Sequence, residues 1–213
     1  MSADALDEGF YRAREAELAE RVGPKRFAHS QAVAATAAEL AAAYGLDERK
    51  ARLAGILHDW DKAYDDSAIL ARVEELDAAV DPELLSMPRL LHGMTAAAAL
   101  ARDFPQIPAD VIQAVERHTV GAEAMEPLDM VVYVADALEP GRTGPEAEAL
   151  RQAVGAVSLR ELYLRTYAHL LCSMLARRKR LYSKTAAFWN ACMEDEGSYR
   201  AAPGADPMPP AAR

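Results

Sequence analysis

Apolar residues recur along most of the chain at the three- and four-residue spacing of helices, with charged residues between them. In the segment from Asp4 to Val22, Phe10, Leu18 and Val22 lie near one helical face, and charged residues fill the others. The same pattern, interrupted by turn residues, predicts further helices. Their ranges are 24–44, 47–62, 65–76, 88–103, 109–118, 127–139 and 145–154, followed by one or two long helices over 158–194.

Local signals set the ends of several of these helices. Pro24 suits a first helical position, Gly45 suits the residue after a helix, and Asp47 suits an N-cap. Residues 130–135, MVVYVA, have strand propensity, but they follow Pro127 and continue into ADALE, so a helix is favoured. Because alanine, leucine, glutamate and arginine are also abundant, the sequence predicts an all-α fold.

The composition argues against several classes of protein. The 213 residues fit one domain, alone or with a helical appendage. A net charge of -9 argues against a general nucleic-acid binder. No apolar run reaches the roughly 18 residues that a membrane span needs, and the acidic N-terminus does not resemble a signal peptide. Cys172 and Cys192 are expected to be free thiols, so we predict a cytoplasmic protein without nucleic-acid or membrane partners.

Histidine and aspartate supply the candidate chemistry. Four histidines fall one per predicted helix and two aspartates accompany them: His29, His58, His92, His118, Asp59 and Asp136. Adjacent His58 and Asp59 would point about 100° apart on a helix, so Asp59 could reach a second ion. Asp136 interrupts an apolar helix, where a charge needs a partner or a metal. Imidazole and carboxylate without thiolate suit an open catalytic site for iron, manganese, cobalt, nickel or zinc, and six ligands suit two ions better than one.

Cationic side chains accompany these ligands. If the helix continues past His58, Lys62 stands over the same pocket, four residues further on. Arg26 and His29 share a face at i and i+3, and Arg142 follows the end of the helix that carries the last aspartate. Taken one at a time, these cations are also what a solvated helix surface would show.

The order of these residues resembles the H…HD…D signature of the HD-domain metal-dependent phosphohydrolases, and the two further histidines resemble those of members that hold two metals. Several local sequences resemble a narrower group, the YqeK-type symmetrical bis(5'-nucleosyl)-tetraphosphatases. These are KRFAHSQAVA, AGILHDWDK, LLHGMTAA, ERHTVG and YVADALEPGR, with RLYSKTAAFWN near the C-terminus. The resemblance extends roughly over residues 22–190.

This resemblance implies metal-dependent hydrolysis of diadenosine tetraphosphate to two ADP, with a hydroxide bridged between two metal ions as the nucleophile. The ions would be divalent or mixed-valence, with iron expected first and manganese, cobalt or zinc as alternatives. All six residues named above would be ligands, with Asp59 bridging. Asp59, Lys62 and Arg142 are the implied catalytic residues. Lys62, Thr119 and Arg142 match positions near the phosphates, and Arg26 is a further candidate for substrate binding.

The resemblance also predicts how the chain is organised. We expect an N-terminal helix over 1–22, an HD phosphohydrolase core over 23–145, C-terminal helices over 146–196 that pack on the core, and a disordered tail over 197–213. The expected partner is a dinucleoside polyphosphate substrate. Apolar positions on the C-terminal helices could support a homodimer.

Two other functions stay open. The chain could be an HD phosphohydrolase acting on another nucleotide, such as a deoxynucleoside monophosphate or a guanosine polyphosphate. It could also bind nucleotides without turning them over. One residue departs from the family pattern: Asp61 places an acid beside Lys62, where it would lower the local affinity for polyphosphate.

Overall fold

The computed structural model describes residues 5–195, and within that range the protein is all-α, as predicted. It contains ten α-helices and two short 3₁₀ helices, and no strand occurs among the described residues. No helix in this part of the chain has both the length and the apolar character needed to cross a bilayer. The helices are α1 (Glu8–Arg21), α2 (Pro24–Tyr44), α3 (Glu48–Leu57), α4 (Asp66–Glu75), η1 (Pro82–Ser86), η2 (Pro88–Leu90), α5 (His92–Asp103), α6 (Ala109–Arg117), α7 (Pro127–Leu138), α8 (Pro145–Ala153), α9 (Leu159–Ala176) and α10 (Lys184–Asp195).

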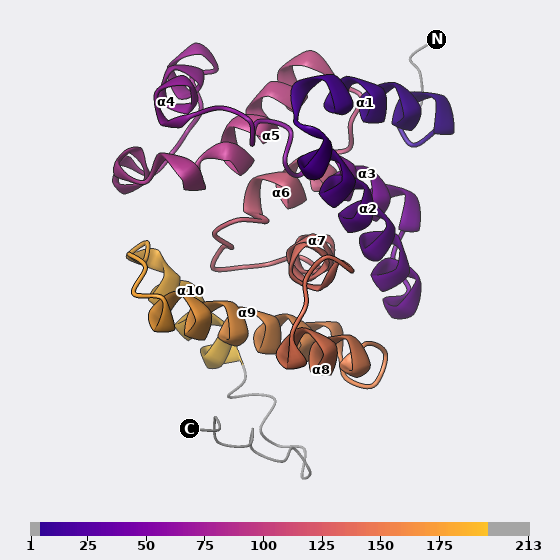
Figure 1. The fold of residues 1–213 in the computed structure, drawn as a ribbon, viewed down its shortest axis with the longest axis vertical. Coiled ribbons are helices and arrows are strands. Elements are labelled where there is room, and N and C mark those ends of the chain that lie inside the picture. Colours follow the sequence, from indigo (N-terminus) through magenta and orange to yellow (C-terminus); the bar gives the residue numbers. More distant parts are fainter. Residues whose placement is uncertain (1–4, 196–213) are drawn as a thin grey trace.

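Helix α7 forms the centre of the bundle. In Figure 1 it is seen end-on, between α2 and α3 on one side and α8 and α9 on the other, and it contacts α2, α3, α6, α8 and α9. Val131, Val132 and Val134 are fully buried. A helix that is apolar on nearly every face is stable only when it is covered on nearly every face. This explains why the strand-like stretch of α7 is a helix, and it fixes Asp136 near the middle of the molecule.

Helices α2 and α3 pack very closely. A Cβ at Gly55 would lie 2.7 Å from Ala34 Cα, so only glycine fits at this crossing. Small residues at a helix contact let the two backbones approach. The close approach brings the C-terminal end of α3, with His58 and Asp59, beside the first turns of α2, which carry Arg26 and His29.

Three helix boundaries differ from the prediction by several residues. Helix α1 begins at Glu8 rather than Asp4, because Asp7 caps it by accepting from the Phe10 N–H. Helix α3 ends at Leu57 instead of continuing through Lys62, and consecutive turns follow, in which Lys62 N donates to Asp59 O at 3.0 Å. Helix α5 begins at His92, after the separate 3₁₀ turn η2.

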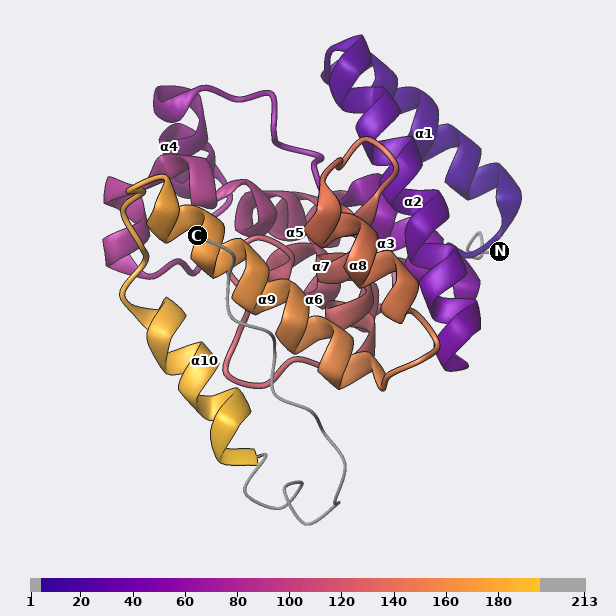
Figure 2. The same cartoon turned by 60° about the horizontal axis from the view of Figure 1, so that its bottom comes forward.

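The C-terminal helices cover the core on the side of α7. Figure 2 shows α9 crossing the front of the bundle and α10 turning away from it. The predicted stretch over 158–194 forms two helices, and the break between them occurs over residues 177–183. This connection is attached to η1: Tyr182 Oη donates to Asp81 at 2.9 Å, Lys184 pairs with Asp81 at 2.8 Å, and Ser183 N donates to Glu83 at 3.2 Å. The predicted disordered tail, 197–213, lies outside the described residues.

Candidate metal centre and active site

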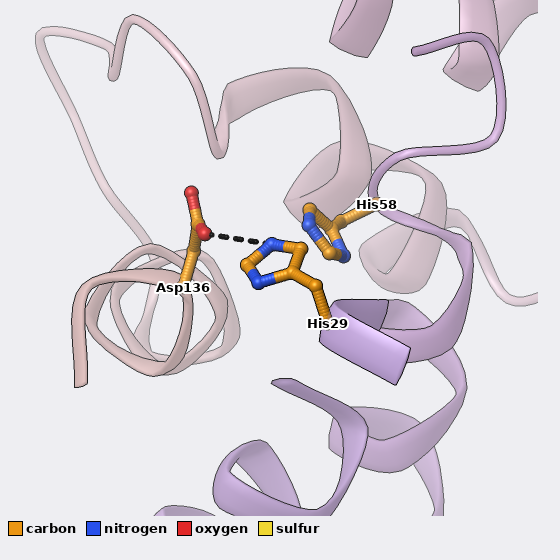
Figure 3. Close-up of side chains that lie close together, drawn as sticks. All are labelled: His29, His58 and Asp136. Atoms are coloured by element: carbon orange, nitrogen blue, oxygen red, sulfur yellow. Dashed lines mark ion pairs between the residues drawn. The ribbon is translucent and has the colours of Figure 1, made fainter. Parts of the chain in front are cut away.

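The six predicted ligands meet at one place, although they come from separate helices. His29 comes from α2 and Asp136 from α7, and their side chains approach to 3.1 Å between Nε2 and Oδ1, with His58 beside them (Figure 3). His58 and Asp59 follow α3, His92 begins α5, and His118 follows α6. Of these six side chains, only those of His29 and Asp136 are more than about a tenth exposed.

The Asp59 carboxylate divides the histidines into two pairs. Its Oδ2 lies 3.3 Å from His58 Nε2 and 3.7 Å from His29 Nε2. Its Oδ1 lies 3.2 Å from His92 Nε2 and 3.9 Å from His118 Nε2. Asp136 adds a second carboxylate on the Oδ2 side. One carboxylate with imidazoles at both oxygens is the arrangement that a residue bridging two ions would have.

Backbone carbonyls fix the orientation of three of the imidazoles. His58 Nδ1 bonds Gly55 O at 2.7 Å, His92 Nδ1 bonds Arg89 O at 2.9 Å, and His118 Nδ1 bonds Val115 O at 2.6 Å. A carbonyl oxygen can only accept, so each Nδ1 must carry the proton. In the neutral imidazole each Nε2 is then a bare lone pair directed at the cluster, as metal ligation requires.

These lone pairs fit a divalent metal. His92 Nε2 and His118 Nε2 lie 3.1 Å apart, a distance at which two lone pairs repel unless a cation or a proton lies between them. His58 Nε2 is buried without a hydrogen-bond partner among the described residues. Buried polar atoms are normally paired. Four imidazoles and two carboxylates are also the donor set expected for first-row divalent ions.

The electrostatics favour ionised Asp59 and neutral His92 and His118, which are the forms that bind metal. His58 differs: burial lowers its pKa, but the neighbouring Asp59 carboxylate outweighs this and raises it. Burial opposes ionisation of Asp59, but the neighbouring imidazoles of His58 and His92 attract its negative charge, and this outweighs the burial and holds the Asp59 pKa well below its usual range. Burial lowers the pKa of His118 to about 3 and also lowers the pKa of His92. Both imidazoles are therefore neutral at physiological pH. Burial likewise opposes ionisation of Asp136, but the adjacent His29 and nearby positive charges such as Arg142 outweigh it and hold the Asp136 pKa below its usual range.

The predicted substrate residues surround this cluster. Arg26 Nη1 lies 2.8 Å from Asp59 Oδ2, and Arg142 Nη2 lies 2.8 Å from Asp136 Oδ1. Lys62, on the turns after α3, still reaches the cluster: its Nζ is 3.2 Å from His92 Nε2 and 3.9 Å from Asp59 Oδ1. Burial lowers the Lys62 pKa, and the Asp59 carboxylate opposes this by raising it.

Thr119 is the remaining predicted residue and lies beside the second histidine pair, His92 and His118. Its Oγ1 is 3.1 Å from His92 Nε2 and 3.0 Å from His118 Nε2. All four predicted substrate residues therefore lie beside the metal ligands.

Glu139 belongs to this site but was missed in the sequence. Its buried carboxylate contacts His29 Nδ1 at 3.2 Å and accepts from Gly141 N–H at 2.5 Å. Arg142 Nε lies 3.6 Å from the same carboxylate. Glu139 therefore orients both a candidate metal ligand and a candidate phosphate ligand. Its position three residues after Asp136, on the same helical face, was the available signal.

The expectation for Asp61 was wrong. Its buried carboxylate points away from Lys62 and pairs with Arg21 at 3.0 Å and with Arg72 at 3.3 Å. Two arginines compensate this negative charge, so it does not oppose an anion at Lys62. Asp61 instead connects α1 and α4 to the turns after α3.

Two cavities border the cluster. The charged pocket has a volume of about 860 Å³ and is lined by Arg26, Lys62, Ser67, Arg89 and His92, among others. The aromatic pocket has a volume of about 480 Å³ and lies against α7, α9 and η2. Much of its lining is aromatic or apolar, including Met87, Leu90, Val120, Tyr133, Tyr167 and Met174. Both pockets share Asp66, Pro88 and Arg89.

The HD domain model matches residues 26–141, which is more than half of the chain and includes all six candidate ligands. The chain belongs to the HD-domain family. This HD-domain protein is 35% identical to the symmetrical bis(5'-nucleosyl)-tetraphosphatase of Staphylococcus aureus, over 62% of this chain and 68% of that protein. It is 29% identical to the protein of the same name from Halalkalibacterium halodurans, over 80% of this chain and 90% of that protein.

A solved structure also resembles this HD-domain protein. The crystal structure of a "predicted HD superfamily hydrolase involved in NAD metabolism" from Clostridium acetobutylicum superposes with a TM-score of 0.79 at 30% identity, covering 87% of this chain and 97% of that one. The resemblance to the symmetrical tetraphosphatases is thus confirmed. Membership of the HD-domain family, together with the histidine–aspartate cluster, implies that the site binds a divalent metal.

Proposed function

We propose that this HD-domain protein hydrolyses diadenosine tetraphosphate symmetrically and releases two ADP. Relatives that carry this activity in their names match most of the chain. The observation that carries the proposal is the division of the Asp59 carboxylate between two pairs of imidazoles. The six residues around it would hold two ions. When bound, two such ions supply a nucleophilic water at neutral pH and neutralise phosphate oxygens.

The cations of the chain bind and orient the polyphosphate. Arg26 and Arg142 are 39% and 48% exposed and each uses part of its guanidinium on an aspartate, so N–H donors remain for phosphate oxygens. Lys62 brings a positive charge beside Asp59, where it would stabilise charge on the departing ADP oxygen. Thr119 offers a hydroxyl beside His118. A phosphoanhydride oxygen is a good leaving group, so this assignment needs no general acid.

The test is product analysis on protein purified without chelator and supplied with ferrous, manganous or cobalt ion. ADP as sole product from diadenosine tetraphosphate supports the proposal, whereas ATP plus AMP overturns the symmetrical register. Asp59→Ala should abolish hydrolysis and reduce bound metal while helical content is kept. Asp103→Ala is the matched control, because Asp103 is exposed and pairs only with Arg102 among the residues described.

Several finer points belong to the proposal. We infer iron as the native metal, with manganese, cobalt or zinc as alternatives, and metal analysis of protein purified without added metal tests this. The division into residues 1–22, 23–145 and 146–196, a homodimer and a cytoplasmic location also remain predictions. Analytical ultracentrifugation would test the dimer.

A further inference from the structure

The aromatic pocket next to the candidate metal centre has no role in the chemistry described so far. It touches the cluster through Thr119, which contacts both His92 and His118. Tyr133 and Tyr167 stack within its lining, with ring centroids 5.8 Å apart and planes 18° from parallel. Both rings are almost fully buried, so they form a rigid aromatic wall. A ligand that enters this pocket therefore has one end against this wall and its other end beside the candidate metal ligands.

One wall of the aromatic pocket is a connection between helices that hydrogen bonds hold in place. The connection between α9 and α10 supplies Lys179, Arg180 and Tyr182 to the lining. Two carboxylates of the η1 region hold this connection in place, because Asp81 bonds Tyr182 and Glu83 bonds Ser183. Segments about a hundred residues apart in the sequence thus close one cavity.

The chemistry of the two pockets is complementary. The charged pocket has one aromatic residue, Tyr64, among several charged and polar ones, which suits a polyphosphate. The aromatic pocket combines apolar surface with cations at its edge, which suits a planar base attached to a phosphate. A volume of about 480 Å³ is within the usual range for small-molecule sites. Asp66, Pro88 and Arg89 line both, and Arg89 pairs with Asp66 at 3.4 Å, so one ligand can extend past this ion pair from one pocket into the other.

We propose that the aromatic pocket binds one adenosine of the substrate, with its base against Tyr133 and Tyr167, while the polyphosphate continues past Thr119 and Arg89 into the charged pocket. This inference rests on the proposed function and deepens it. A nucleoside held on a fixed wall beside Thr119 sets the distance from the ribose to Asp59. That distance decides which phosphorus is attacked.

Filling the pocket tests the proposal. Met174 lines it from α9, and Met174→Trp would occupy the space of the base. The neighbouring Leu175 is 56% exposed and does not line the pocket, so Leu175→Trp is the matched control. Ser86→Trp fills the same pocket from the opposite, exposed wall and replaces the first variant if that one does not fold, as judged by circular dichroism.

The measurement is the binding of ADP and of inorganic pyrophosphate to manganese-loaded protein by titration calorimetry. The wild type should bind ADP more tightly than pyrophosphate. Met174→Trp should weaken ADP binding about tenfold or more, since the new side chain takes the space of the base, and leave pyrophosphate binding unchanged. Leu175→Trp should behave as the wild type. Hydrolysis of bis(p-nitrophenyl) phosphate, which has no nucleoside, should be kept in all three.

Two results would overturn the inference: no preference for ADP over pyrophosphate in the wild type, or an unchanged preference in both pocket variants. Failure of the proposed function looks different. In that case the wild type does not hydrolyse diadenosine tetraphosphate, while the preference for ADP is still present and still lost in Met174→Trp.

Discussion

Glu139 offers a direct test of how the protein orients its metal ligands. Its carboxylate accepts from two N–H groups, His29 Nδ1 at 3.2 Å and Gly141 N at 2.5 Å. In Glu139→Gln the side chain keeps its shape but has one acceptor oxygen and one NH₂ donor. One of the two N–H groups must then face the NH₂ group of the glutamine, so its hydrogen bond is lost inside a buried site.

The size of the effect follows from this loss. Leaving a buried hydrogen-bonding group unsatisfied costs about 1–3 kcal/mol, and loss of an outer partner of a metal-bound histidine typically lowers metal affinity or activity about 10- to 100-fold. We therefore expect Glu139→Gln to lower manganese affinity or kcat by about that factor. The mechanism requires that Glu139→Asp, which restores two acceptors on a shorter arm, recovers part of the loss.

The assay is a titration of activity on diadenosine tetraphosphate against free manganese, with bound metal measured by mass spectrometry. Glu146→Gln is the control, because Glu146 is exposed at the start of α8. Wild-type metal affinity and wild-type kcat in Glu139→Gln would refute the idea that Glu139 orients His29. A lower melting temperature with unchanged metal affinity would assign it a structural role only.

Three further predictions concern stability. Gly55→Ala should destabilise the fold by about 1–3 kcal/mol, because its Cβ would lie 2.7 Å from Ala34 Cα; urea unfolding measures this, and a wild-type midpoint would contradict it. A chelator should lower the melting temperature by roughly 5–10 °C, since ions at about 100 times their Kd stabilise the native state by about 2.7 kcal/mol; scanning calorimetry with and without EDTA decides, and identical curves would count against a metal centre. Hydrogen bonds from Lys184, the Glu83 backbone and Tyr182 lower the pKa of Asp81 to about 2, so its stabilising contribution is complete above pH 4 and is lost as the pH falls toward 2. Asp81→Asn should flatten that part of the profile of melting temperature against pH, and an unchanged slope would refute the assignment.

Much of the fold was predictable because local signals agree with the tertiary structure. Pro24 and Gly45 bound α2 as the sequence indicates, and Asp47 and Asp65 cap their helices through side-chain oxygens. The strand-like residues of α7 are helical because the bundle covers them on every side. The site could be predicted for a similar reason. Each candidate histidine lies at or near the end of its own helix, and helix ends meet where loops leave room for a ligand.

The misses come from interactions between distant segments. No glycine or proline marks the end of α3, so the sequence allows the helix to continue as far as Lys62. In the structure the chain turns there, and the two aspartates point in different directions: Asp59 to the histidines and Asp61 to Arg21 and Arg72. The aromatic pocket could not be predicted either, since its walls join η1 to the connection after α9.

The backbone carbonyls that hold the imidazoles have a consequence for the choice of metal. Gly55 O, Arg89 O and Val115 O fix three rings through bonds within each ring's own turn of chain, independently of any ion. Donors arranged in this way do little to favour one first-row ion over its neighbours, and their affinities follow the general order from manganese upward to copper. The choice among these metal ions must then be set by which of them the cell supplies. The metal recovered with this protein should therefore depend on the composition of the growth medium. The supply of metal ions in the cell, more than the geometry of the protein, would then decide the rate of hydrolysis.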